Sequence, residues 1–308
     1  MTDTLIVCNP ASGRVKKQLP QIRKLMASTP QVTYAEADGP QQLAACFREH
    51  DVWNKRLLIV VGGDGTFHAV LTLLFGNGDH DHPPLLALVA GGTTNMTAAD
   101  FGIRGKPCQV LRRLLAGAGD IESRSITRYY LKVHHRGQTL CGMFLGNGLI
   151  AAGVRYYQTK LAATGVTGET LPGLVYARFL LAWLLGKTRV PATESSIRVE
   201  GETRFTGPAA LTLVSTLQRL LLGCRPYWGD GQSPLKLTSV REKPQALLRS
   251  LLPVMFGRGE RLDPASYMSL SARMIELDFN GDFIIDGELY STDSGLQISS
   301  GEFTLARL

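Results

Sequence analysis

The pattern of apolar and polar positions divides the chain into two parts. In the first part, unbroken apolar runs at Thr4–Cys8, Leu57–Val61 and Leu85–Ala90 are typical of strands buried on both faces of a parallel sheet. Segments of helix-forming residues separate these runs, and we expect helices at residues 18–27, 40–49 and 107–116 and a short strand at 32–34. A further helix is expected after residues 62–66, with Val70, Leu71 and Leu74 on one face. This alternation predicts a parallel α/β domain.

After about Asp120 the pattern changes to short, β-prone segments separated by turn residues. Asn280-Gly281 lies between two of them and predicts a hairpin. The expected strands are residues 121–133, 140–145, 196–205, 209–216, 235–240, 273–279, 283–285 and 296–308. Two apolar insertions, residues 171–185 and 245–256, are expected to be helical. The second part therefore reads as an antiparallel β-sandwich or barrel.

Three turns in the first part directly follow expected strands, at Asn9–Gly13, Gly62–Thr66 and Gly91–Asn95. The carboxyl ends of parallel strands share one edge of a sheet, where ligands bind in such folds, so we expect the turns to converge there. A glycine turn before a helix presents backbone N–H groups and the positive end of the helix dipole. Such a point binds phosphate.

Two acidic features accompany these turns. Asp64 stands inside the GGDGT turn, where a carboxylate beside phosphate is repulsive unless it holds a metal ion or abstracts a proton. Asp286-Gly287-Glu288 is by itself an ordinary β-turn sequence, although near a nucleotide its two carboxylates could bind a metal ion or deprotonate an alcohol. We interpret Gly146–Ala151 as a turn, despite its likeness to a dinucleotide fingerprint, because it lies in the β-rich part.

Composition and charge indicate the compartment and the kind of partner that we expect for this protein. The 308 residues suffice for two domains, and five scattered cysteines without a CxxC pair indicate a reducing compartment. No signal peptide is recognisable at the N-terminus. The net charge of +7 resides in residues 171–262, which hold 13 Lys and Arg against 6 Asp and Glu. We favour an anionic membrane surface as its partner over nucleic acid, with an ordinary solvated surface as the alternative.

Taken together, these residues resemble the diacylglycerol kinase catalytic-domain family, which includes bacterial lipid kinases, sphingosine kinases and ceramide kinases. Five motifs stand in the family's order: Asn9–Gly13, Gly62–Thr66, Gly92–Asn95, Asp230-Gly231 and Asp286–Glu288. The resemblance implies an α/β fold of two domains. The nucleotide-binding domain, of the parallel NAD-kinase or phosphofructokinase type, would span residues 1–120 with 296–308 returning to it. The antiparallel β-sandwich, residues 121–295, would take the lipid.

The resemblance also assigns roles to single residues. Glu288 would accept the proton, with Asp286 as its essential neighbour, whereas sphingosine-kinase-like members use the aspartate at the position of Asp64 as the base. Mg²⁺ would bind to Asp230, helped by main-chain groups near Tyr227 and Gln232. The residues implied to bind ATP are Asn9, Ser12, Gly13, Gly62, Gly63, Asp64, Gly65, Thr66, Phe67, His68, Ala69, Gly92 and Thr93.

The expected function is therefore that of an ATP- and Mg²⁺-dependent lipid kinase acting on diacylglycerol or a related lipid alcohol. We expect a cytoplasmic protein in peripheral contact with an anionic membrane, with no nucleic acid partner and with a homodimer allowed. Two alternatives stay open: an NAD-kinase-like enzyme with a soluble substrate, and a degenerate family member that binds without turnover. Met96 departs from the family pattern, where an aspartate is usual, and keeps the second alternative open.

Overall fold

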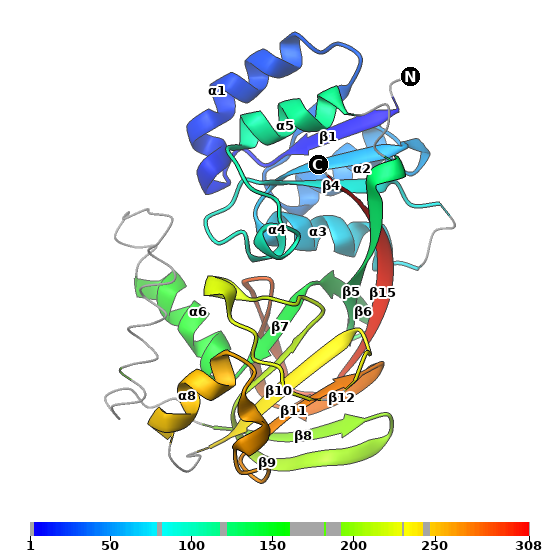
Figure 1. Cartoon of the computed structure of the whole chain (residues 1–308). Coiled ribbons are helices and arrows are strands. Elements are labelled where there is room, and N and C mark those ends of the chain that lie inside the picture. Colours follow the sequence, from blue (N-terminus) through cyan, green and yellow to red (C-terminus); the bar gives the residue numbers. More distant parts are fainter. Residues whose placement is uncertain are drawn as a thin grey trace. The chain divides into compact units, whose positions relative to one another are not determined.

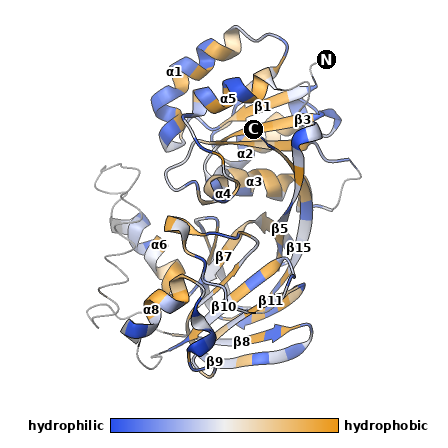
Figure 2. Cartoon of the chain, in the orientation of Figure 1, coloured by the Kyte–Doolittle hydropathy of each residue, from blue (hydrophilic) through white to orange (hydrophobic). Residues whose placement is uncertain are grey.

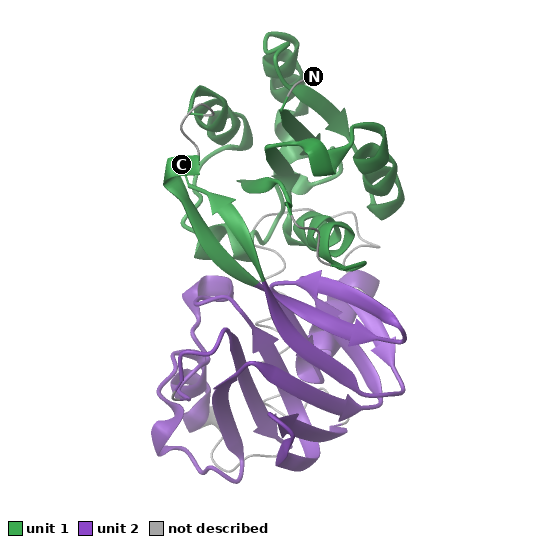
Figure 3. Ribbon diagram, turned by 90° about the vertical axis from the view of Figure 1, so that its right-hand side faces the viewer, with its two compact units in different colours: residues 1–129, 302–308 green, residues 130–301 purple. Residues whose placement is uncertain are grey.

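The computed structural model describes residues 3–78, 82–117, 122–160, 182, 192–229, 231–242 and 247–307. The chain divides into two compact units (Figure 3). Unit 1 consists of Met1–Tyr129 and Glu302–Leu308, and unit 2 of Tyr130–Gly301. Apart from Ala182, the apolar insertion at residues 171–185 lies outside the described residues.

Unit 1 is built on a parallel sheet with the strand order β4-β3-β1-β2. Its strands are β1 (Thr4–Cys8), β2 (Thr33–Glu36), β3 (Leu57–Gly62) and β4 (Leu85–Ala90). The end of β15 (Leu296–Ala306) also joins this sheet, where Leu305 pairs with Leu86 in parallel. The apolar runs are central strands, and every residue of β1, β3 and β4 is buried. The predicted parallel sheet is confirmed.

Helices cover both faces of this sheet (Figure 1). On one face, α1 (Gly13–Ala27) and α5 (Pro107–Ala116) share a core with Ile6, Ile59 and Val89. The residues between these along the strands, such as Val7 and Val60, point to the other face and are fully buried. There α3 (Asp64–Phe75) packs on β3 and contacts α2 (Pro40–Glu49). The shorter elements of unit 1 are η1 (Val52–Asn54), α4 (Met96–Asp100) and η3 (Glu122–Arg124).

Unit 2 is antiparallel throughout its registered strand pairs. One long strand, β9 (Glu202–Ser215), takes part in two sheets: its first half pairs with β8, whereas its second half pairs with β10 and β7. The first sheet has the order β14-β13-β7-β9-β10-β11, and the second runs from β9 through β8 and β12 to β15, with β5 and β6 beyond. Side chains from both sheets form one buried cluster. The predicted sandwich is confirmed.

Among the described residues, nine further strands and four helices belong wholly or partly to unit 2. The strands are β5 (Ser125–His135, which begins in unit 1), β6 (Gln138–Gly142), β7 (Phe144–Asn147), β8 (Thr193–Val199), β10 (Leu235–Arg241), β11 (Tyr267–Ala272), β12 (Met274–Phe279), β13 (Gly281–Ile285) and β14 (Glu288–Thr292). The helices are α6 (Leu149–Lys160), η5 (Leu221–Gly223), α8 (Leu247–Met255) and η6 (Gly259–Arg261). No helix among the described residues combines the length and the apolar character that crossing a bilayer requires.

The hairpin predicted at Asn280-Gly281 is wrong. The strand before it, β12, pairs with β8 and β15, whereas the strand after it, β13, pairs with β7 and β14. The chain therefore passes from one sheet to the other at this point. The actual hairpin joins β13 to β14 through Asp286 and Gly287, whose φ values are 50° and 92°. Two positive φ values are what a two-residue type I′ turn requires.

The segment Gly146–Ala151 is more than the turn that we expected. Strand β7 ends at Asn147, Gly148 adopts a φ of 58°, and α6 begins at Leu149. A Cβ atom on Gly148 would lie 2.4 Å from the carbonyl oxygen of Ala210. Glycine is therefore required both by the left-handed backbone and by the close approach of β9. The arrangement is a strand, a tight turn and a helix within an antiparallel unit.

Candidate functional site

The three glycine-rich turns of unit 1 contact one another at the carboxyl edge of its sheet. The amide of Arg14, at the start of α1, donates to the carbonyl of Gly91 at 2.8 Å, and the amide of Gly91 donates to the carbonyl of Gly62 at 2.7 Å. The side-chain amide of Asn9 donates to the hydroxyl of Thr66 at 2.9 Å. The predicted convergence of the turns is confirmed.

Glycine is needed here because the turns touch backbone to backbone. A Cβ atom on Gly92 would lie 2.5 Å from the Cα atom of Gly63, and one on Gly63 would lie 3.0 Å from the Cα atom of Gly92. A Cβ atom on Gly91 would lie 2.4 Å from a methyl group of Val15. Close approach of backbone is one of the two physical reasons for glycine. These glycines therefore hold the turns together, whatever ligand they also meet.

Two helices begin at this edge, α1 at Gly13 and α3 at Asp64. Their first N–H groups have no acceptor within the helix, and the positive ends of both helix dipoles point to the same edge. Ser12 occupies the N-cap position of α1 and makes no side-chain capping bond, and the N-cap residue of α3 is Gly63, which has no side chain. The edge therefore presents backbone donors and partial positive charge, which is the chemistry that a phosphate group needs.

Asp64 connects the GGDGT turn to the next turn. Its Oδ1 atom accepts the amide of Thr97, and its Oδ2 atom accepts the amide of Met96, each at 2.9 Å. Burial raises the pKa of Asp64, while the two amides act in the opposite direction. Both carboxylate oxygens are therefore engaged by the first turn of α4. The carboxylate thus has a structural task in addition to any chemical one.

Asn95 closes the second glycine turn and was not among the predicted site residues. Its Oδ1 atom accepts the amide of Gly92 at 2.7 Å, and its Nδ2 atom donates to the carbonyl of Gly92 at 2.6 Å. It is buried and adopts a left-handed backbone, with a φ of 49°. Asparagine tolerates this conformation better than most residues. Its place at the end of the sequence GGTTN was the available signal.

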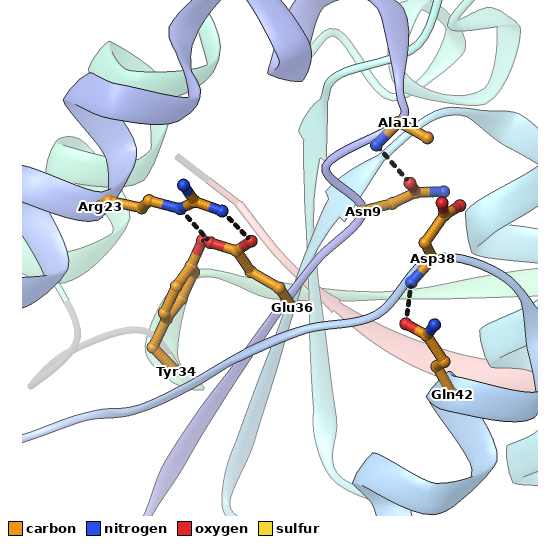
Figure 4. Close-up of polar contacts among 7 residues, drawn as sticks. All are labelled: Asn9, Ala11, Arg23, Tyr34, Glu36, Asp38 and Gln42. Atoms are coloured by element: carbon orange, nitrogen blue, oxygen red, sulfur yellow. Dashed lines mark hydrogen bonds and ion pairs between the residues drawn. The ribbon is translucent and has the colours of Figure 1, made fainter.

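The predicted nucleotide contacts separate into two groups. The side chains of Phe67 and His68 are buried, and Phe67 packs edge-on against Phe303 of β15. They lie in the interior of unit 1 rather than at the edge of the sheet. Asn9 lies at the edge, where its Oδ1 atom accepts the amide of Ala11 at 2.9 Å and shapes the first turn (Figure 4). The other predicted nucleotide contacts lie in the three turns or, like Ala69, in α3: Ser12, Gly13, Gly62, Gly63, Asp64, Gly65, Thr66, Ala69, Gly92 and Thr93.

In unit 2, the two acidic residues of the β13–β14 hairpin have different surroundings. The carboxylate of Asp286 is buried and accepts the amides of Met143 at 2.8 Å and Phe144 at 3.1 Å. The amide of Asp286 donates to the carbonyl of Phe144 at 3.0 Å. Glu288 is exposed at the start of β14. Asp286 therefore fixes the hairpin, and Glu288 presents its carboxylate to solvent.

Tyr290 lies next to this acidic pair. Burial raises the pKa of Tyr290 to about 12, and the negative charges of Glu288 and Asp286 act in the same direction. Its ring stacks on Phe283 with 5.4 Å between centroids. The phenol is therefore neutral at physiological pH, and its ring supports the strand that precedes the turn.

The expected metal site can be described only in part, because Asp230 lies outside the described residues. The flanking loop packs tightly on β11, since a Cβ atom on Gly229 would lie 2.4 Å from the Cα atom of Leu270. Tyr227 is half-buried below the ammonium group of Lys236, and Gln232 is exposed. A carboxylate with main-chain and amide oxygens suits Mg²⁺. Among the described residues, no three His, Cys, Asp or Glu side chains gather as a metal site.

Comparison with solved structures supports the fold. The chain is similar to two structures of proteins from Bacillus anthracis str. Sterne that are named as diacylglycerol kinases, one of them provisionally. The TM-scores are 0.71 and 0.69, with 19% and 18% sequence identity. Each comparison covers 100% of this chain and 97% of the other. A search among curated proteins gave no match.

The family comparison concerns the part of the chain that holds the three turns. Residues 3–122 match the model of the diacylglycerol kinase catalytic domain. This range contains strands β1 to β4 and the three glycine-rich turns of unit 1. The resemblance seen in the sequence motifs is thereby confirmed for residues 3–122, which are similar to the diacylglycerol kinase catalytic domain.

Proposed function

We propose that this protein is an ATP- and Mg²⁺-dependent lipid kinase that phosphorylates the hydroxyl group of diacylglycerol or a related lipid alcohol. The observation that carries the proposal is the convergence of three glycine-rich turns in unit 1, held by the bonds of Arg14 and Gly91. These turns lie in the range that matches the family. We further propose a cytoplasmic protein that meets its substrate by peripheral contact with an anionic membrane.

In this proposal the nucleotide phosphates bind at the turns of unit 1. The first amides of α3 have no helical acceptors and would donate to phosphate oxygens, whereas the amides of Arg14 and Val15 in α1 already donate to the carbonyl of Gly91. The contacts between Gly63 and Gly92 keep side chains away from the backbone at this point. Asp64 contributes by fixing the first turn of α4 through Met96 and Thr97, and this keeps both turns in place while phosphate charge is present.

Mg²⁺, when bound, would offset the negative charge of the phosphates. Asp230 would hold it, helped by main-chain groups near Tyr227 and Gln232. These are oxygen donors, as Mg²⁺ prefers. Gly229, the preceding residue in the sequence, packs tightly on β11.

Glu288 is proposed as the general base. Its exposed carboxylate takes the proton of the lipid hydroxyl while the hydroxyl oxygen attacks the γ-phosphorus. The bond between the γ-phosphorus and the β–γ bridging oxygen breaks, and ADP leaves. Asp286 is a positioning residue, because its own carboxylate is occupied by the amides of Met143 and Phe144. Those bonds fix the turn from which Glu288 extends.

Transfer of labelled γ-phosphate from ATP to a panel of lipids in mixed micelles with Mg²⁺ tests the proposal. The panel contains diacylglycerol, a sphingoid base and ceramide, with NAD⁺ as a soluble acceptor. We expect a labelled lipid that is lost in the Glu288→Gln variant, which should still bind ATP. Labelled NAD⁺ without labelled lipid would favour the NAD-kinase-like alternative. ATP binding without any labelled product would favour the degenerate binder.

A further inference from the structure

One face of α8 exposes apolar and cationic side chains together. Arg249, Leu252 and Phe256 are spaced i, i+3 and i+7 and therefore lie on the same side of the helix and of the residue that follows it. Leu252 is 63% exposed and Phe256 is 52% exposed. Figure 2 shows hydrophobic and strongly hydrophilic residues next to each other along α8. We call Arg249, Leu252 and Phe256 the α8 face.

The orientation of α8 is fixed from its opposite side. Ser250 is buried, and its hydroxyl makes a 2.6 Å hydrogen bond with the hydroxyl of Tyr267 on β11. Gly257, directly after the α8 face, packs against the carbonyls of Arg225 and Tyr227 so closely that a Cβ atom would lie 2.4 Å from the latter oxygen. The helix therefore cannot turn to bury Leu252 and Phe256 without breaking these contacts.

A neighbouring loop adds a third exposed apolar side chain. The amide of Arg225 donates to the carbonyl of Met255 at 2.8 Å, so the loop that begins at Leu220 runs beside the end of α8. Leu222 in this loop is 78% exposed and adopts φ 58° and ψ 21°. A leucine in the left-handed region is strained, and an exposed leucine gains nothing from burial. Such a combination indicates a residue kept in place for contact with a partner.

Cations surround these apolar side chains. Arg225, Arg249 and Arg258 are exposed, and within the part of the chain that the structure describes none of them forms an ion pair with a carboxylate. Arg258 has the exposed Glu260 two positions after it in the sequence. Residues 219–263 contain eight Lys and Arg residues and only four Asp and Glu residues. The surroundings of the α8 face are therefore positively charged.

We propose that the α8 face, with Leu222 and Arg225 of the adjacent loop, docks on the surface of an anionic phospholipid bilayer. Apolar side chains that project between cations match a surface whose acyl region lies just below negatively charged headgroups. The inference rests on the proposed function in one respect, since it supplies the contact through which a lipid kinase reaches its substrate. The residues proposed for this contact lie outside the insertion at 171–185.

Vesicle flotation tests the docking without ATP, and therefore without turnover. We expect the wild-type chain to float with vesicles containing phosphatidylglycerol, to float less at high salt, and not to float with pure phosphatidylcholine. The double variant Leu252→Ser/Phe256→Ser should bind the anionic vesicles at least about tenfold more weakly. Each of Arg225→Gln and Arg249→Gln should weaken binding by about fivefold. The matched controls, Met274→Ser and Arg273→Gln, change an exposed methionine on β12 and its exposed neighbour and should bind as the wild type does.

A second measurement guards against misfolded variants. Phe256→Trp should gain fluorescence quenching by brominated phosphatidylglycerol, whereas Met274→Trp should not. Equal binding of the wild type and the α8-face variants would overturn the proposal. So would a loss of self-association in the serine variants with unchanged vesicle binding, because the face would then contact a second copy. Phosphorylation of micellar lipid by a chain that does not bind vesicles would overturn the docking alone, and vesicle binding without phosphorylation would overturn the proposed function alone.

Discussion

Asp64 holds Thr97: its Oδ1 atom accepts the Thr97 amide at 2.9 Å, while its other oxygen accepts the amide of Met96 at the same distance. Asp286 of unit 2 does the same with the amides of Met143 and Phe144. Asp64 and Asp286 therefore each bind a pair of consecutive amides from another segment of the chain. A carboxylate used in this way sets the geometry of a turn.

Replacing Asp64 should therefore weaken unit 1 as well as nucleotide binding. Asp64→Ala leaves two amides without their acceptor, and we expect a loss of about 2 kcal/mol in the free energy of unfolding. Asp64→Asn should lose a similar amount, because one of its side-chain atoms becomes a donor that faces an amide donor. Chemical denaturation measures both losses, with the exposed Asp38→Ala as control. If Asp64→Asn kept full stability and ATP affinity but lost turnover, Asp64 would be the base.

We expect the two acidic residues of the β13–β14 hairpin to differ in role, with Glu288 chemical and Asp286 structural. Glu288→Gln removes an exposed carboxylate, so the stability of unit 2 and ATP binding should not change, while turnover falls by roughly a hundredfold or more. Asp286→Ala leaves the amides of Met143 and Phe144 unsatisfied and should cost about 2 kcal/mol of unfolding free energy together with turnover. Thermal unfolding and single-turnover assays distinguish the two. A destabilised Glu288→Gln variant would contradict the assignment.

Gly92→Ala should disrupt the phosphate-binding edge without any change of charge. Its Cβ atom would lie 2.5 Å from the Cα atom of Gly63, which is backbone and cannot rotate away. We expect the two turns to separate, with at least a tenfold loss of ATP affinity and a measurable loss of stability. Gly117→Ala is the matched control, because its nearest neighbour would lie at an ordinary 3.5 Å. Calorimetric titration with ATP measures the affinities, and equal values for both variants would refute the backbone-contact argument.

The sequence was most informative where several signals agreed. The apolar runs of β1, β3 and β4 are buried on both faces, and the structure gives them nearly the predicted bounds. Hairpin pairing was less accessible, because Asn280-Gly281 specifies a local backbone turn but not which strands pair across it. The strand β12 found its partners in β8 and β15, which are distant in sequence. Pairing over such distances depends on the packing of the whole sandwich.

The candidate site was also predictable only in part. Because the glycine turns follow parallel strands, their convergence followed from topology. The engagement of Asp64 did not follow, since it depends on the amides of a five-residue helix, α4, that is too short to leave a periodic pattern. The role of Asn95 did not follow either, since it depends on the turn that brings its side chain to the backbone of Gly92. Likewise, helical spacing places the side chain of Phe67 in the core, although the motif would carry it into the nucleotide site. Motifs thus identified the turns, whereas the orientation of each side chain required the structure.

The last prediction concerns pH and the ion pair that ties α1 to β2 (Figure 4). Arg23 donates two hydrogen bonds to Glu36, at 2.8 and 2.7 Å, and Tyr34 donates a third at 2.8 Å. The bonds from Arg23 are the main reason that the pKa of Glu36 lies below its ordinary value of 4.5. A carboxylate with a lowered pKa stabilises the folded state above its unfolded pKa, and this contribution is lost as the pH falls through the folded value.

Glu36→Gln should therefore lower the free energy of unfolding by about 0.5–1 kcal/mol at neutral pH, the scale of a partly exposed pair. The difference from the wild type should be constant between neutral pH and the ordinary pKa and should shrink below it, because both chains then lack the charge. Urea unfolding at a series of pH values measures this, with the exposed Glu49→Gln as control. A difference that persisted unchanged at low pH would show that shape and hydrogen bonding, rather than the charge of Glu36, provide the stabilisation.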